Sequence, residues 1–357
     1  MNILVIGAGV LGSLYAAYLS RSGNKVSLLA RGERLKQLRE HGLVVEKWDT
    51  GERFEAPVNL VESLAADDAY DLVLVLVRKN QVDALLPMLA ANRVTPNILF
   101  MVNNAEGYQP LVNALGAERV LLGFPGAGGT RIDHVIQYHI VEGNTQPTTI
   151  GEIDGRITTR LQTIATAFEE AGFSISLSTN MDAWLKTHVA LVSPIANALY
   201  LAGGDNYRLS RTPDGIILMV RAVKEGLSVL NQLGIPITPA KYRVLSWIPE
   251  PILIAVMRKS LNTQRAELLM ARHANHARDE MGKLAEEFHQ LALQSGLPTP
   301  AMDYLRLFIT PDVPPLPENN DRIALDWRGV WKLMAGSAAL ITGGIVLAHL
   351  LKRDSRG

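Results

Sequence analysis

The N-terminus joins a short apolar stretch to a glycine-rich turn, and this combination limits most strongly what the chain can fold into. Residues 3–6 are aliphatic, the next six form a G-x-G-x-x-G pattern, and helical apolar spacing follows. In such a turn the first glycine permits the tight bend, the second lets a diphosphate approach the backbone, and the third lets helix and strand pack closely. The pattern predicts a dinucleotide-binding unit rather than a βαβ turn without a nucleotide. The expected cofactor contacts are Gly7, Ala8, Gly9, Val10, Leu11 and Gly12.

The first half of the chain alternates short aliphatic runs with segments of helical spacing. The expected buried strands lie at residues 3–6, 25–29, 72–77, 98–102 and 120–122. Between about residues 138 and 178, two further strands around a helix at 157–171 are expected to close the sheet. Alternation of this kind is typical of a parallel sheet with helices on both faces. The predicted fold class is therefore α/β, a doubly wound Rossmann-type domain over residues 1–180.

The second half loses the strand pattern at about residue 181. Apolar spacing becomes helical, and the clearest helix is expected over residues 261–295. Its apolar stripe is Met270, Ala274, Ala277, Met281, Leu284, Phe288 and Leu291, and Gly296 is expected to end it. The sequence predicts an all-helical second domain over residues 181–310.

Beyond residue 310 the amino-acid composition changes again. Residues 311–326 form a proline-rich linker, and residues 327–357 are expected to form a hydrophobic C-terminal helix. Residues 333–351 contain no ionisable side chain except His349 and have roughly the 20-residue length that crosses a bilayer. Trp327 and Trp331 precede this stretch, and basic residues flank it. We expect a membrane anchor on a cytoplasmic enzyme body; a C-terminal helix docked on the protein is the alternative.

Composition excludes several classes of function. The chain has 35 basic and 35 acidic residues, so no nucleic-acid partner is expected. It has no cysteine, which rules out disulfides, thiolate catalysis and cysteine-ligated zinc.

The end of the second expected strand indicates which dinucleotide is bound. An NAD enzyme usually has an acidic residue there to accept hydrogen bonds from the ribose, but this chain reads Leu-Ala-Arg-Gly with Arg31. An arginine can pair with a 2′-phosphate, which favours NADP. A solvated loop arginine is the alternative reading, and nearby Glu33 weakens the electrostatic argument.

Together these motifs resemble the ketopantoate reductase (2-dehydropantoate 2-reductase) family, from residue 1 to about residue 307. After the strand at 72–77 the family usually has a lysine followed three positions later by glutamine; here Arg78 and Gln81 stand there. After the strand at 98–102 it has an asparagine, matched by Asn103. The resemblance implies that Arg78 and Asn103 contact the cofactor.

In the helical half the resemblance implies the catalytic residues. Lys186, in Trp184-Leu185-Lys186, matches the lysine proposed as general acid, and Glu280 falls where the family has a site glutamate. If Pro194 anchors the comparison instead, Leu185 takes the place of the lysine. Ala190 stands where the family has asparagine, and Leu268 is the nearest match to its substrate-binding serine.

The resemblance implies an NADP-dependent reductase of a small 2-keto acid or related carbonyl compound. Lys186 would donate the proton, and Glu280 would orient it or bind a substrate hydroxyl. His188 is the alternative donor. His273, His276 and Glu280 share one helical face and could grip a metal, but a polar border is the preferred interpretation and no metal is expected. Other hypotheses are a non-catalytic NADP-binding sensor or scaffold at a membrane, and a different dehydrogenase of hydroxy acids or imines.

Overall fold

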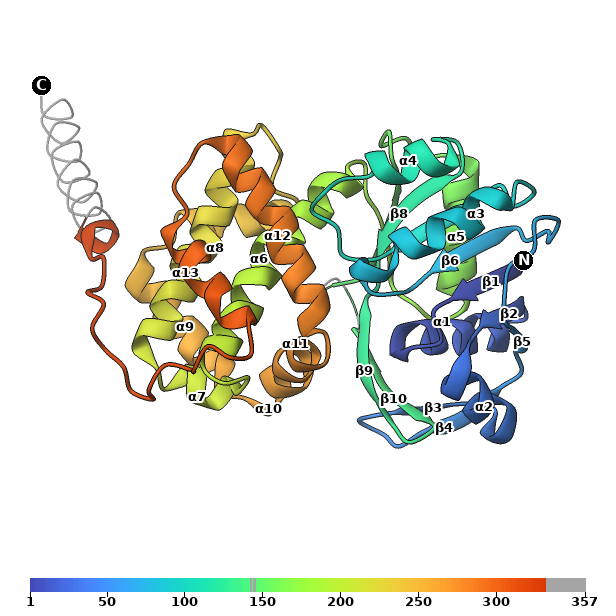
Figure 1. The fold of residues 1–357 in the computed structure, drawn as a ribbon, viewed down its shortest axis with the longest axis horizontal. Coiled ribbons are helices and arrows are strands. Elements are labelled where there is room, and N and C mark those ends of the chain that lie inside the picture. Colours follow the sequence, from blue (N-terminus) through green and yellow to red (C-terminus); the bar gives the residue numbers. More distant parts are fainter. Residues whose placement is uncertain (142, 144–145, 332–357) are drawn as a thin grey trace, which may run out of the picture.

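Two lobes lie side by side in the structure (Figure 1), one of strands and helices and the other of helices. The computed structural model describes residues 1–141, 143 and 146–331 of the chain. The fold class predicted from the sequence, an α/β unit followed by a helical one, is confirmed.

The first lobe is built on a sheet that has eight strands within the described residues. In sheet order these are β12 (Ile175–Leu177), β11 (Thr148–Glu152), β8 (Val120–Phe124), β7 (Ile98–Met101), β6 (Leu72–Val75), β1 (Asn2–Ile6), β2 (Lys25–Leu29) and β5 (Asn59–Val61). All neighbouring pairs are parallel except β8 and β11. The carboxyl ends of β1, β6, β7 and β8 therefore meet at one edge, where an α/β sheet binds its ligand.

Helices cover both faces of this sheet. The helical elements of this lobe are α1 (Val10–Arg21), α2 (Gly32–His41), η1 (Lys79–Gln81), η2 (Asp83–Leu85), α3 (Leu86–Ala91), α4 (Gln109–Leu115) and α5 (Thr159–Glu170). Leu14 of α1 and Phe168 of α5 pack in the core on one face, with alternate strand residues such as Val5. Leu89 of α3 and Leu111 of α4 pack in the core on the other. The two strands and helix expected near the end of this lobe are confirmed as β11, α5 and β12.

A second sheet lies under α1 and was not expected from the sequence. Its order is β4 (Arg53–Ala56), β3 (Leu43–Lys47), β10 (Val135–Ile140) and β9 (Ala127–Ile132). The stretch near residue 138 therefore belongs to this sheet and not to the large one. Its outer strands β4 and β9 are only partly buried, and β9 contains two glycines, so the apolar signal is weak.

The second lobe is helical. Its elements are α6 (Met181–Leu201), α7 (Asn206–Ser210), α8 (Pro213–Gln232), η3 (Ala240–Ser246), α9 (Glu250–Leu261), α10 (Gln264–Ala266), η4 (Glu267–Ala271), α11 (Arg272–His276), α12 (Arg278–Ser295), α13 (Pro300–Arg306) and η5 (Leu307–Ile309). The long helix α6 connects the two lobes, because Trp184 packs in the core of the first lobe and Val189 in that of the second.

The prediction of a single helix over residues 261–295 is wrong. The segment is divided into α10, the π-helical turn η4, α11 and α12, with Ala277 out of helical geometry at the last junction. Arg78 of the first lobe donates a hydrogen bond of 2.6 Å to the carbonyl of His276 at this point, which competes with the helical ladder. The expected apolar stripe does face the core, and Gly296 ends α12 in the left-handed conformation (φ +68°).

The proline-rich segment after residue 310 lies along the helical lobe. The buried carboxylate of Asp214 accepts hydrogen bonds from the Asn320 amide and from the backbone of Arg322 and Ile323. The membrane anchor expected at residues 333–351 lies outside the described residues. In the part of the chain that the structure describes, no helix is long and apolar enough to cross a bilayer.

Candidate active site

The glycine turn has the shape that a dinucleotide needs. Gly7 has φ +111°, and a Cβ added to Gly12 would lie 1.8 Å from the carbonyl oxygen of Gly7. A Cβ on Gly9 would meet nothing within 4 Å, so the space in front of this residue is open. Gly9 also begins α1 without a side-chain cap, which leaves backbone N–H groups available for an anion. The turn therefore fits a diphosphate.

Arg31 lies at the end of β2, where the sequence placed it, and begins α2. Its Nε donates to the carbonyl of Glu62 at 3.0 Å. Glu33 forms its ion pair with Lys36 at 3.6 Å rather than with Arg31. The guanidinium is therefore not neutralised by the acid that weakened the sequence argument.

Arg34, one turn later on α2, is a second arginine at this site that sequence reasoning missed. Its Nε donates to the carbonyl of Ala8 at 3.1 Å, and its Nη2 contacts the Ser13 hydroxyl at 3.3 Å. Burial, reinforced by the charge of Arg131, lowers the pKa of Arg34 to about 10. Within the described residues, neither Arg31, Arg34 nor Arg131 forms an ion pair with a carboxylate. Among the described residues, Arg31 and Arg34 near the glycine turn therefore have no carboxylate partner.

Asn103 and Glu280 meet across the boundary between the lobes. Asn103 follows β7, Glu280 stands in the first turn of α12, and the Asn103 Nδ2 donates to Glu280 Oε1 at 3.2 Å. Both residues are buried, and Asn103 Oδ1 has no hydrogen-bond partner in the structure. A buried, unpaired acceptor is costly, so this atom is suited to receive a donor from a ligand.

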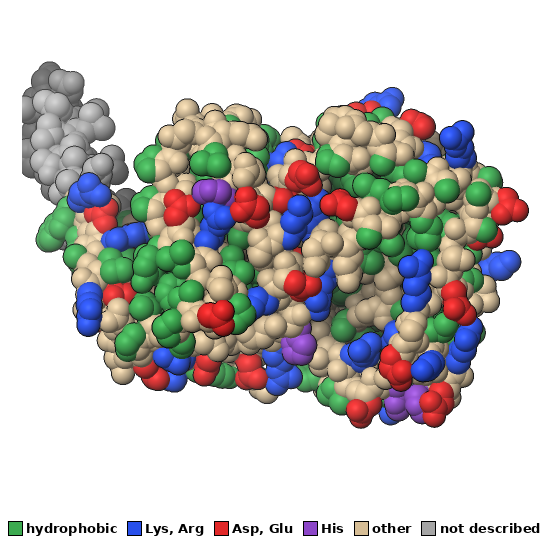
Figure 2. All heavy atoms as spheres, in the orientation of Figure 1, with side chains coloured by type: hydrophobic (Ala, Val, Ile, Leu, Met, Phe, Trp, Pro, Cys, Tyr) green, Lys and Arg blue, Asp and Glu red, His purple; other side chains and the backbone are tan. Residues whose placement is uncertain are grey.

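Arg78 faces the second lobe. Its Nη1 lies 2.9 Å from the Asp279 carboxylate, and Asn80 donates to the same group. Acidic, basic and histidine side chains gather along the boundary between the lobes (Figure 2). We call this boundary the interlobe seam: residues 78–80 and 103–107 of the first lobe, with residues 182–188 and 273–287 of the second. In this structure Arg78 ties the lobes together.

Lys79 and Glu287 form a buried ion pair that the sequence analysis did not identify. Lys79 Nζ lies 3.1 Å from Glu106 and 3.5 Å from Glu287, and both Lys79 and Glu287 are almost fully buried. Burial raises the pKa of Glu287, opposed by Lys79 and by the backbone amides of Ala105 and Glu106. Glu287 lies seven residues after Glu280, on the same face of α12, and that spacing is the signal that could have found it.

Lys186 lies on the first half of α6 with only 12% of its side chain exposed. Its Nζ is 2.5 Å from Asp182, and a Cβ on Gly107 would lie 3.5 Å from it. Lys186 thus stands at the seam beside the loop that starts at Asn103, while Glu280 contacts Asn103 itself. Leu185, the alternative in the shifted comparison, is packed in the core of the first lobe.

Two histidines also lie at the seam. The His188 ring stacks on Trp184, with ring centres 5.3 Å apart, and lies 4.2 Å from the Phe124 ring. Burial, with the nearby charge of His273, lowers the pKa of His188 to about 3. Because His188 stays neutral near pH 7, it is a poor proton donor there.

The lowered pKa of His188 predicts that the folded protein loses stability in acid. Below about pH 6.5 the unfolded chain protonates His188 and the folded chain does not, so stability should fall as the pH drops toward about 3. We expect His188→Phe, which keeps an uncharged ring, to lose less stability than wild type between about pH 7 and pH 4. Urea unfolding at each pH measures this, with the exposed His276→Ala as control. Equal losses in wild type and His188→Phe would contradict the assignment.

Two residues of the possible metal site, His276 and Glu280, make other contacts. His276 Nδ1 lies 2.7 Å from the carbonyl of Arg272 in its own helix. Among the residues that the structure describes, no group of three or more potential ligands is placed to hold a metal ion.

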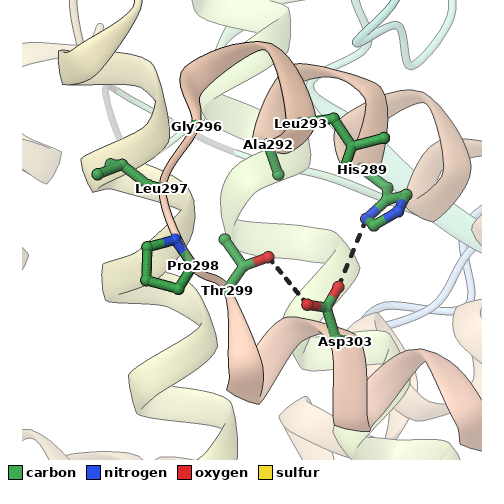
Figure 3. Close-up of a pocket in the computed structure, with 8 residues that line it drawn as sticks. All are labelled: His289, Ala292, Leu293, Gly296, Leu297, Pro298, Thr299 and Asp303. Atoms are coloured by element: carbon green, nitrogen blue, oxygen red, sulfur yellow. Dashed lines mark hydrogen bonds and ion pairs between the residues drawn. The ribbon is translucent and has the colours of Figure 1, made fainter.

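A separate hollow of about 330 Å³ lies in the helical lobe, between the end of α12 and the start of α13 (Figure 3). Its polar side chains satisfy one another, because Asp303 contacts His289 at 3.4 Å and accepts from the Thr299 hydroxyl at 3.3 Å. The hollow contains no residue of the glycine turn or the seam. Its contacts hold the turn at Gly296, and we do not count it as the active site.

Comparison with known proteins decides the family. The family model for "Ketopantoate reductase PanE/ApbA" matches residues 3–155. A 2-dehydropantoate 2-reductase of Halobacterium salinarum is 30% identical over 241 residues, 67% of this chain and 78% of the relative. The chain belongs to the ketopantoate reductase family. It is an oxidoreductase of this type, and ketopantoate reductases use a nicotinamide cofactor.

Solved structures agree on the fold. The 2-dehydropantoate 2-reductase of Geobacter metallireducens has a TM-score of 0.70 at 18% identity, covering 87% of this chain and 99% of that one. A D-mandelate dehydrogenase, in complex with NADH and anilino(oxo)acetate, has a TM-score of 0.69 at 18% identity and covers 87% and 97%. At these identities the likeness shows the shared fold.

Proposed function

We propose that the protein is an NADP-dependent reductase that converts a small 2-keto acid or related carbonyl compound to the alcohol. The observation that carries the proposal is the buried hydrogen bond from Asn103 Nδ2 to Glu280 at the carboxyl edge of the sheet. The other polar atom of the same side chain, Asn103 Oδ1, has no partner in the structure. The glycine turn after β1 opens at the same edge. A site that binds a dinucleotide would then present one end of it to these buried polar groups.

The cofactor and four residues of this chain divide the work. A nicotinamide, when bound, supplies a hydride to the carbonyl carbon. Asn103 Oδ1 and the Glu280 carboxylate are buried hydrogen-bond acceptors, so they would receive a donor such as a hydroxyl group of the substrate. Lys186 gives a proton to the carbonyl oxygen, and Asp182 keeps the ammonium in place until then.

The arginines around the glycine turn favour NADP over NAD. Arg31 at the end of β2 and Arg34 one turn later bring positive charge to this site, and in the described part of the chain neither forms an ion pair with a carboxylate. A 2′-phosphate would supply the missing anion through charge-assisted hydrogen bonds. The mandelate dehydrogenase neighbour is described with NADH, so the fold alone does not determine whether NAD or NADP is bound. The proposal of NADP therefore rests on the arginines. We therefore also propose a cytoplasmic enzyme body, because NADPH is available inside the cell.

The test is NADPH oxidation with a panel of 2-keto acids that includes ketopantoate. Turnover of any of them supports the proposal. Tight NADPH binding with no oxidation across the panel would instead indicate a binding protein.

Cofactor choice gives a separate prediction. Wild type should bind NADPH at least about tenfold more tightly than NADH, and Arg31→Ala should remove the difference, because a charge-assisted pair to phosphate is worth roughly 1.5–3 kcal/mol. Titration calorimetry with both cofactors measures it. Arg39→Ala is the matched control, since Arg39 lies on the same helix and pairs with exposed Glu62. Equal affinity of the wild type for both cofactors would remove the NADP assignment.

A further inference from the structure

Two carboxylates of α12, in the helical lobe, accept hydrogen bonds from the loop that follows β7 in the first lobe. Glu280 and Glu287 lie two helical turns apart on the same face of α12. Glu280 Oε1 accepts from Asn103 Nδ2 at 3.2 Å, at the start of the loop. Glu287 Oε2 accepts from the backbone N–H groups of Ala105 at 3.1 Å and Glu106 at 3.3 Å. One helix of the second lobe therefore contacts this loop at its beginning and at its middle.

Lys79 connects both carboxylates to the first lobe. Its ammonium lies 3.5 Å from Glu287 Oε1 and 3.1 Å from Glu106 of the loop. Its backbone N–H donates to Glu280 Oε1 at 3.3 Å. The partly exposed ammonium of Lys283 lies 3.8 Å from the same Glu287 oxygen. The two oxygens of Glu287 thus have separate partners: Oε2 contacts backbone amides and Oε1 faces positive charge.

The loop itself is a tight turn that is docked on the second lobe. The Asn104 side chain donates to the carbonyl of Gly107 at 2.8 Å and accepts from its N–H at 3.2 Å, which closes the turn. Ala105 is fully buried and belongs to the apolar core of the helical lobe. A displacement of this turn from α12 would break these contacts, and Asn103, which immediately precedes Asn104, would move with it.

We infer that Glu287 is a positioning residue: it fixes the loop after β7 to α12 and so aligns the Asn103 amide with Glu280. The inference rests on the proposed function, because the alignment affects catalysis only if Asn103 and Glu280 receive a donor from the substrate. Glu287 acts through the loop, since its hydrogen bonds are accepted from Ala105 and Glu106. A misplacement of about 1 Å at a reacting site can cost about 10²-fold in rate, so loss of this contact should be visible in kcat.

The first test removes the carboxylate. Glu287→Ala should lower kcat at least about tenfold for the 2-keto acid that the wild type reduces fastest. The Kd for NADPH should change less than about threefold, because the glycine turn and Arg31 lie outside the seam. Glu286→Ala is the matched control, since Glu286 is the preceding residue of α12, is exposed and pairs with Arg306 at 2.6 Å.

The outcomes of this test separate the inference from the proposed function. Wild-type kcat in Glu287→Ala overturns the inference and leaves the proposed function standing. Failure of the wild type to reduce any acid of the panel counts against the proposed function instead.

The second test separates the hydrogen-bond acceptor from the charge. Because Glu287→Ala also leaves Lys79 with one partner fewer, two double variants remove both charges. Lys79→Met/Glu287→Gln keeps an amide oxygen that can accept from Ala105 and Glu106, and Lys79→Met/Glu287→Ala has none. We expect the first to keep kcat within about threefold of wild type and the second to lose at least about tenfold. Equal kcat in the two variants, both shown by thermal unfolding to be folded, overturns the inference.

The third test asks whether Glu287 acts through Asn103. Effects of residues that act on one another do not combine independently. Glu287→Ala should therefore lower kcat less than about threefold in the Asn103→Ala background, against at least about tenfold in the wild type. A general loss of folded protein would lower the rate equally in both backgrounds. A full tenfold loss in the Asn103→Ala background overturns the inference.

The fourth test needs no turnover. Hydrogen exchange of the backbone amides of Ala105 and Glu106 should be at least about tenfold faster in Glu287→Ala than in wild type, because their acceptor is gone. The amides of β6 and β7 should exchange as in wild type. Unchanged exchange at both loop amides would show that Glu287 does not fix the loop, and would overturn the inference.

Discussion

Replacing Lys186 by alanine is expected to lower kcat by two or more orders of magnitude while the protein stays folded. Lys186 stands at the interlobe seam with its ammonium held by Asp182 at 2.5 Å, and removal of a positioned proton donor costs about 10²- to 10⁴-fold. The lysine is part of neither apolar core, since its ammonium pairs with Asp182 beside Gly107 at the seam. Steady-state kinetics at saturating NADPH and keto acid measure the loss.

Two further variants separate proton donation from simple charge. Lys186→Arg keeps a cation beside Asp182, but a guanidinium does not release its proton near neutral pH, so kcat should remain low while KM recovers. Lys36→Ala is the control, because Lys36 is an exposed helical lysine paired with Glu33 outside the seam. Unchanged kcat in Lys186→Ala would remove the lysine from the mechanism. Full activity in Lys186→Arg would reduce its role to binding.

The parts of the fold that sequence analysis predicted depend on local pattern. The turn at Gly7 to Gly12 could be recognised because its geometry is set within one strand, one turn and one helix. Gly296 ended its helix as expected for the same reason. The strands of the small sheet could not be found this way, because β3 pairs with β10 across about ninety residues and the outer strands lack a fully apolar face.

In the candidate site, too, the residues that follow a local sequence pattern could be predicted, and those that depend on tertiary contacts could not. Counting back from Gly296 located Glu280, and the structure brings it to Asn103, which lies 177 positions earlier. Lys79 and Glu287 were missed, since a buried ion pair between lobes becomes visible only when α12 is docked on the loop after β6. The break at Ala277 is similar: the stripe along α11 and α12 is continuous in sequence, and the hydrogen bond from Arg78 to His276 that accompanies the break is a tertiary contact.

Replacing Gly12 by alanine should damage the fold as well as cofactor binding. The new methyl group would lie 1.8 Å from the carbonyl oxygen of Gly7, which is backbone and cannot rotate away. The helix α1 must then shift from β1, and its buried residues Leu14 and Tyr15 shift with it. We expect the free energy of unfolding to fall by about 3 kcal/mol, or the melting temperature by roughly 5–10 °C. Thermal unfolding without cofactor measures this loss.

Gly9→Ala separates ligand fit from folding at the same turn. Gly9 has φ −77° and ψ −163°, a conformation open to alanine, and its added Cβ meets nothing within 4 Å. The apo protein should therefore keep its stability to within about 0.5 kcal/mol. The methyl group would stand where the diphosphate approaches the backbone, so the Kd for NADPH should rise at least about tenfold. If Gly9→Ala bound NADPH like wild type, the diphosphate would have to lie elsewhere, and the turn would be only a packing device between β1 and α1.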